Sequence, residues 1–202
     1  MYLIGICSIV SLAIFFERFF YLKKTESDDR TFFGNLYKKL ESDNIPDAIH
    51  LCDHSKGILS ADILKPALMK ANSSRSELKE YVGEAVSREI PKLESKIPVL
   101  GTIASIAPLL GLLGTVLGMI NTISAYEQEL SILKSSTAGL QTTSSLLNGI
   151  WSALITTAAG LIVAIPSLSA YNYLVTKVNN LIELTRAKAN DIIELVIIKS
   201  SS

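Results

Sequence analysis

The stretch IPVLGTIASIAPLLGLLGTVLGMINTISAY, residues 97–126, contains no Asp, Glu, Lys or Arg. A second uncharged stretch occupies residues 135–176. A helix that crosses a bilayer needs roughly 20 mostly apolar residues, and both stretches exceed that length. The chain is 49% hydrophobic and 19% charged overall, which is not extreme for a soluble protein. The segregation of the charges, rather than their number, therefore predicts membrane spans.

The remaining sequence is divided by the same criterion. Residues 1–22 are interpreted as a first span and not as a cleaved signal peptide, because they have no basic start and no small-residue cleavage site. The predicted order is a transmembrane helix at 1–22, a cytoplasmic helical region at 23–96, a transmembrane helix at 97–126, a periplasmic connection at 127–145, a transmembrane helix at 146–174 and a cytoplasmic C-terminal helix at 175–202. No β-type alternation competes with helical periodicity, so we expect an all-α membrane protein.

The orientation is predicted from Lys and Arg near the ends of the spans, which favour the cytoplasmic side. The flanking basic residues are Arg18, Lys23 and Lys24 after the first span, Lys92 and Lys96 before the second, and Lys177, Arg186 and Lys188 after the third. Lys134 is the only basic residue in the connection 127–145. We therefore expect an inner-membrane protein with a periplasmic N-terminus. Glu17 and Arg18, at the edge of the first span, are predicted to be interfacial.

Several function classes are disfavoured. The formal net charge is zero and no basic block interrupts the chain, which argues against nucleic-acid binding. The motif HLCDH at residues 50–54 is a poor metal site, because Cys52 points away from the helix face that His50 and His54 share. No Walker loop or Ser-His-acid set is present. The sequence thus predicts no enzyme activity, no metal and no cofactor.

Small residues recur at spacings of three and four along both long spans, which places each set on one helix face. The sets are Gly101, Ala104, Pro108, Gly111, Thr115, Gly118 and Thr122 in the second span, and Gly149, Ala153, Thr157, Gly160, Ala164 and Ser167 in the third. Such stripes let helix backbones approach closely. Residues assigned to helix packing are Gly101, Pro108, Gly111, Gly114, Gly118, Gly149, Gly160 and Pro166.

Hydroxyl side chains lie on or beside these stripes and are candidates to line a proton path. They are Thr115, Thr157, Ser152, Thr156 and Thr122. Helix packing alone also explains any one of them, since such hydroxyls often bond to their own backbone. Neither span contains Asp, Glu, His, Lys or Arg, although a proton pathway usually needs a titratable group at depth. If protons move here, another polypeptide must supply the carboxylate.

The stretch TIASIAPLLGLLGTVLGMINTI, residues 102–123, resembles the second-helix signature of the ExbB/TolQ/MotA proton-channel superfamily. LNGIWSALITTAAGLIVAIPSLSAYNYL, residues 147–174, resembles its third-helix signature, and ERFFYL at 17–22 also fits. The pore threonines of the family correspond to Thr115 and Thr157. Some members carry a glutamate where this chain has Ser152, which puts in doubt any carboxylate role for this subunit.

The resemblance is strongest to ExbB and implies a homo-oligomer, a pentamer around a central pore. Inside the pore, single-span helices of an ExbD- or TolR-like subunit would supply an essential aspartate. Proton flow would then drive a stator-like motor that acts on a TonB- or TolA-like protein. Two alternatives remain: a TolQ-like subunit of the Tol-Pal envelope system, and a non-conducting oligomeric scaffold in the membrane. A self-contained channel is disfavoured by the lack of buried charge.

Overall fold

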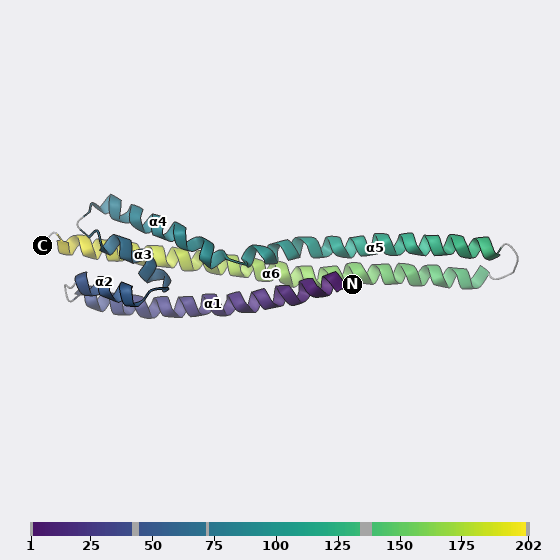
Figure 1. Ribbon diagram of the computed structural model, residues 1–202, viewed down its shortest axis with the longest axis horizontal. Coiled ribbons are helices and arrows are strands. Elements are labelled where there is room, and N and C mark those ends of the chain that lie inside the picture. Colours follow the sequence, from purple (N-terminus) through teal and green to yellow (C-terminus); the bar gives the residue numbers. More distant parts are fainter. Residues whose placement is uncertain (1, 42–44, 72, 134–138, 201–202) are drawn as a thin grey trace. The chain divides into compact units, whose positions relative to one another are not determined.

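The computed structural model describes residues 2–41, 45–71, 73–133 and 139–200 (Figure 1). All regular secondary structure in these residues is helical. The helices are α1 (Tyr2–Glu41), α2 (Ile45–His54), α3 (Leu59–Leu68), α4 (Arg75–Glu94), α5 (Ile97–Leu133) and α6 (Gly139–Ser200). Three of them, α1, α5 and α6, are long and apolar enough to cross a membrane. The predicted all-α class with three transmembrane helices is confirmed.

The long helices continue beyond the predicted ends of the spans. Helix α1 runs past residue 22 to Glu41, and α6 runs unbroken from the third span to Ser200. Most of the predicted connection 127–145 is also helical, and residues 134–138 lie outside the described part of the chain. A change from apolar to polar side chains marks a membrane boundary, but Lys, Glu and Arg are good helix formers and do not end a helix.

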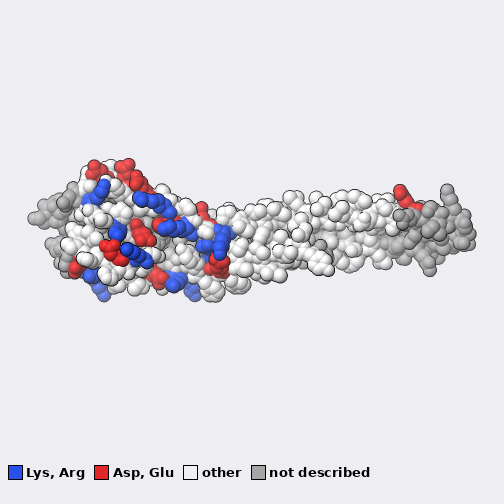
Figure 2. All heavy atoms as spheres, viewed as in Figure 1, with Lys and Arg blue, Asp and Glu red and all other residues white. Residues whose placement is uncertain are grey.

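The chain forms two compact units. The first, here called the membrane unit, comprises Met1–Phe16 and Ile97–Asn172. The second, here called the polar unit, comprises Glu17–Lys96 and Tyr173–Ser202. Nearly all Lys, Arg, Asp and Glu side chains lie on the polar unit, whereas the described surface of the membrane unit is almost uncharged (Figure 2). Large apolar side chains such as Leu109, Leu113 and Ile162 are exposed on the membrane unit, as expected for contact with lipid or other subunits.

The polar unit has its own hydrophobic core. Helix α3 packs against both α2 and α4, and the core is completed by the polar parts of α1 and α6. Its fully buried side chains include Leu36, Leu64, Leu78 and Ile192. Helix α4 begins with a capping box, in which Ser74 and Glu77 exchange side chain-to-backbone hydrogen bonds. The predicted helical character of residues 23–96 thus corresponds to a packed helical unit.

A buried carboxylate joins three helices of the polar unit. Asp29 of α1 is only 4% exposed. It accepts a hydrogen bond of 2.9 Å from the backbone N–H of Ser60, in the first turn of α3, and one of 3.3 Å from the hydroxyl of Thr185 in α6. Burial raises the pKa of the Asp29 carboxyl above its ordinary value, and the hydrogen bonds from Ser60 and Thr185 oppose part of that rise.

Candidate functional site

Helices α5 and α6 of the membrane unit approach each other at glycines. A Cβ atom added to Gly160 would lie 2.6 Å from the carbonyl oxygen of Ala107 and 3.2 Å from the Cα of Gly111. A Cβ at Gly111 would lie 2.9 Å from the carbonyl oxygen of Thr156. These neighbours are backbone atoms, so the two helices are nearly in backbone contact. We call this contact the glycine seam, formed by Gly111, Gly114, Gly118, Gly149 and Gly160.

The other glycines of the stripes also face the opposite helix. A Cβ at Gly114 would lie 2.8 Å from the hydroxyl oxygen of Thr156, and one at Gly118 would lie 3.2 Å from the Cβ of Ala153. Gly149 lies against Thr122. A Cβ at Gly101 would lie 3.2 Å from a ring carbon of Tyr171. The structure therefore places all six of these predicted packing glycines between helices of the same chain. The predicted packing prolines, Pro108 and Pro166, lie inside the continuous helices α5 and α6.

Two of the predicted path residues lie within the glycine seam. The Thr156 hydroxyl is positioned to donate to the carbonyl oxygens of Ala153, at 2.7 Å, and Gly111, at 3.3 Å. The Thr122 hydroxyl donates to the carbonyl oxygen of Gly118 at 2.7 Å. Both side chains are half-buried. Within one subunit, these two hydroxyls therefore bond to backbone at the contact between α5 and α6.

The other three hydroxyl side chains lie beside the seam. Thr115 is half-buried and donates to the carbonyl oxygen of Leu112 at 2.7 Å. Thr157 is also half-buried, and its Cα lies 3.0 Å from the Cβ position of Gly111. Among the described residues, none forms a hydrogen bond with the Thr157 hydroxyl. Ser152 is exposed. Thr115 and Thr157 thus lie next to the contacts made by Gly111 and Gly114, and both residues are half-buried.

A second polar contact in the membrane unit was not predicted in full. The hydroxyls of Ser11 in α1 and Ser167 in α6 form a buried hydrogen bond of 2.7 Å. Ser167 belongs to the stripe of small residues in the third span, but its partner lies 156 positions away in sequence. The only sequence signal for Ser11 is a hydroxyl inside an apolar segment. This bond provides a specific contact between the first and third spans.

The predicted interfacial residues lie in the polar unit. Glu17 forms an ion pair with Lys96, which connects α4 to α5 and adopts a left-handed conformation with φ of 64°. Arg18 is buried and its guanidinium carbon lies 5.2 Å from the centre of the Tyr21 ring. The sequence identifies Lys96 only as a basic residue that flanks the second span. Its ion pair with Glu17 brings together the end of the first apolar segment and the start of the second.

The HLCDH segment lies on α2. Cys52 is 1% exposed, and burial raises the pKa of its thiol to about 11. His50 and His54 are exposed, and a ring nitrogen of His54 lies 3.0 Å from the carbonyl oxygen of His50. In the described part of the chain, no three His, Cys, Asp or Glu side chains are grouped so that they could hold a metal ion. The Cys52 thiol stays protonated near neutral pH and packs as an apolar side chain.

The sequence of this chain is similar to those of known membrane proteins. Residues 54–187 match the MotA/TolQ/ExbB proton channel family. The chain is 30% identical over 161 residues to the putative biopolymer transport protein ExbB-like 3 of Synechocystis sp., which covers 80% of this chain and 73% of that protein. The chain therefore belongs to the MotA/TolQ/ExbB proton channel family and is a multi-pass membrane protein.

Two further relatives match over shorter segments. The Tol-Pal system protein TolQ of Haemophilus influenzae is 43% identical over 95 residues, which is 47% of this chain and 38% of TolQ. The biopolymer transport protein ExbB of Xanthomonas campestris pv. campestris is 36% identical over 113 residues, which is 55% of this chain and 41% of that ExbB. The matched segments span less than half the length of these two relatives.

Proposed function

We propose that this chain is the channel subunit of an inner-membrane, stator-like motor of the ExbB–ExbD type. It would convert proton-motive force into mechanical work for TonB-dependent transport across the outer membrane, and it would not be an enzyme. The observation that carries the proposal is that the uncharged stretches within α5 and α6 contain hydroxyl side chains but no acidic or basic ones. Hydroxyls at Thr115 and Thr157 can contact water, yet residues 97–126 and 135–176 contain no Asp, Glu, Lys, Arg or His.

The lack of a carboxylate in the uncharged stretches indicates what a partner subunit must supply. A proton path through a membrane usually needs a titratable group at depth. We infer that a single-span ExbD- or TolR-like subunit provides it as an aspartate, and that this helix occupies a pore formed by a ring of five copies of the present chain. A TonB- or TolA-like protein would then receive the force. The ring is supported by the wide exposed apolar surface of the membrane unit, which other copies can cover.

A TolQ-like role in the Tol-Pal system is the second candidate. The segment shared with TolQ of Haemophilus influenzae has the higher identity, 43%, whereas the match to the ExbB-like protein of Synechocystis covers more of the chain, 80%. Deletion of the gene separates the two functions. Loss of energised uptake with an intact envelope supports the ExbB-type role, and a leaky envelope with normal uptake supports the TolQ-type role.

The assembly is tested by the mass of the detergent-purified protein. We expect native mass spectrometry to show five copies of this chain, with additional mass when the single-span subunit is co-expressed. A stable monomer at working concentration, with or without that subunit, would contradict the ring.

We expect the N-terminus and the connection between α5 and α6 to face the periplasm, because Lys and Arg accumulate at the opposite ends of the spans. Single cysteines at Ser136, which lies outside the described residues, and at Ser73 of the polar unit test this in a background that lacks Cys7 and Cys52. A membrane-impermeant thiol reagent added from the periplasm is expected to label position 136 and not position 73. The reverse pattern would overturn the orientation.

A further inference from the structure

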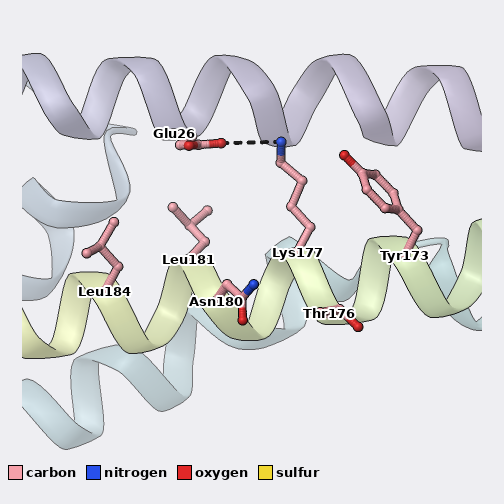
Figure 3. Close-up of a pocket in the computed structure, with 7 residues that line it drawn as sticks. All are labelled: Glu26, Tyr173, Thr176, Lys177, Asn180, Leu181 and Leu184. Carbon is pink, nitrogen blue, oxygen red and sulfur yellow. Dashed lines mark ion pairs between the residues drawn. The ribbon is translucent and has the colours of Figure 1, made fainter.

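Two neighbouring grooves lie between α1 and α6 in the polar unit. One has a volume of about 300 Å³ and is lined by Glu26, Tyr173, Thr176, Lys177, Asn180, Leu181 and Leu184. The other has a volume of about 320 Å³ and is lined by Phe19, Lys23, Glu26, Ser27, Arg30 and Lys177. They share Glu26 and Lys177. Lys177 reaches from α6 towards Glu26 of α1, with Tyr173 and Leu181 on either side of it (Figure 3).

The two grooves carry a net positive charge. Glu26 lies 3.2 Å from the ammonium nitrogen of Lys177 and 3.9 Å from the guanidinium of Arg30. Lys23 is a third cation in the lining. Among the described residues, Glu26 is the only acid that lines either groove. One carboxylate cannot neutralise three cations, so the grooves favour an anionic ligand.

Lys177 is held in place before any ligand arrives. Its ammonium group pairs with Glu26 and lies 5.7 Å from the centre of the Phe19 ring, and its side chain is only 21% exposed. A lysine held in this way loses less side-chain freedom on binding an anion than a fully mobile surface lysine does. Tyr173 and Asn180 add hydrogen-bonding groups beside it.

The grooves begin where the apolar segments end. Lys23 directly follows Leu22, and Lys177 directly follows the uncharged stretch 135–176. The rings of Phe19 and Tyr173 lie with centroids 6.2 Å apart at this boundary. Aromatic side chains next to basic ones are typical of the level of lipid head groups, and basic pockets between membrane helices on the cytoplasmic side bind anionic head groups.

We propose that these grooves bind the phosphate of an anionic phospholipid, with Lys177, Lys23 and Arg30 around the phosphate oxygens. The acyl chains would lie against α1 beside the grooves, where Phe20 is exposed. Binding would tie α1 to α6 at the membrane surface. Neither a proton flux nor a particular oligomer is needed for this binding, so it stands apart from the proposed function.

The experiment titrates the detergent-purified, delipidated full-length protein with phosphatidylglycerol or phosphatidylethanolamine and counts bound lipids by native mass spectrometry. The wild-type protein is expected to retain phosphatidylglycerol in preference to phosphatidylethanolamine. The variant Lys23→Gln/Lys177→Gln is expected to raise the Kd for phosphatidylglycerol by about tenfold or more, since each basic residue near an anionic lipid contributes to attraction. The matched control Lys24→Gln/Lys79→Gln removes the same charge from residues that line neither groove, and its Kd is expected to stay near the wild-type value.

Three results would overturn the proposal. Equal loss of phosphatidylglycerol in the control variant would show attraction by overall charge rather than by these grooves. Equal retention of the two lipids would show that the head group is not recognised. A changed oligomer mass with unchanged lipid retention in the Lys23/Lys177 variant would show that a neighbouring subunit occupies the grooves. Circular dichroism of every variant verifies that the helices are retained.

Discussion

Replacing Gly160 with alanine is expected to destabilise the membrane unit strongly, whereas the same change at Gly5 is expected to leave it stable. The new Cβ at position 160 would lie 2.6 Å from the carbonyl oxygen of Ala107, and at Gly5 it would meet nothing within 4 Å. Backbone atoms cannot rotate away, so α5 and α6 must separate. Overpacking of this kind typically costs about 1–3 kcal/mol.

Comparing Gly160→Ala with Gly5→Ala separates the effect of the contact between α5 and α6 from the effect of alanine on the helix itself. Both glycines lie inside helices of the membrane unit, so alanine brings the same gain in helix propensity of about 1 kcal/mol at each position. We expect the thermal unfolding midpoint of the detergent-purified protein to fall by about 5 °C or more for Gly160→Ala and to stay level or rise for Gly5→Ala. Equal midpoints for the two variants would mean that α5 and α6 do not meet at the glycine seam.

Valine at Thr115 and Thr157 is expected to leave assembly intact and to lower work driven by proton-motive force by about tenfold or more. Valine has nearly the shape of threonine, so it preserves packing while it removes the hydroxyl. The Thr115 hydroxyl bonds to the carbonyl oxygen of Leu112, which it can exchange for water or a partner carboxylate. In our proposal these two hydroxyls solvate the proton as it reaches the partner's aspartate.

Thr102→Val provides the matched control. Thr102 is an exposed threonine of the same helix α5, and its hydroxyl donates to the carbonyl oxygen of Pro98 at 3.1 Å. We expect this variant to retain function, measured as energised uptake in cells at equal expression. Wild-type uptake by the Thr115→Val/Thr157→Val variant would show that the two hydroxyls are dispensable and that these threonines only pack helices.

The three membrane helices could be predicted from sequence because charge segregation is a local property of the chain. The glycine positions could be predicted for the same reason, since spacings of three and four define a helix face. The sequence could not predict which helix packs against the face that carries the glycines. Thr122 shares a stripe with Thr115, and Thr156 lies beside the stripe that contains Thr157. Only the structure shows that Thr122 and Thr156 lie in the seam between helices of one chain.

Polar contacts between residues far apart in the chain could not be predicted from the sequence either. Asp29 pairs with Ser60, 31 positions away, and Ser11 pairs with Ser167, 156 positions away. Each partner is an ordinary polar residue in its local context, and the pairing depends on how the helices pack. Helices α1 and α6 continue through the polarity boundaries at residues 22 and 174, because polar residues such as Lys and Glu continue a helix readily.

Proton flux into liposomes tests most directly whether this chain forms a proton path that a second polypeptide completes. Vesicles would contain this chain alone, or this chain with its single-span partner, and an imposed membrane potential would drive protons towards an internal pH-sensitive dye. We predict flux for the complex, a rate lower by about tenfold or more for the complex with Thr115→Val/Thr157→Val, and no flux above that of empty vesicles for the chain alone. Flux through the chain alone at the rate of the complex, or a wild-type rate for the double variant, would contradict the account.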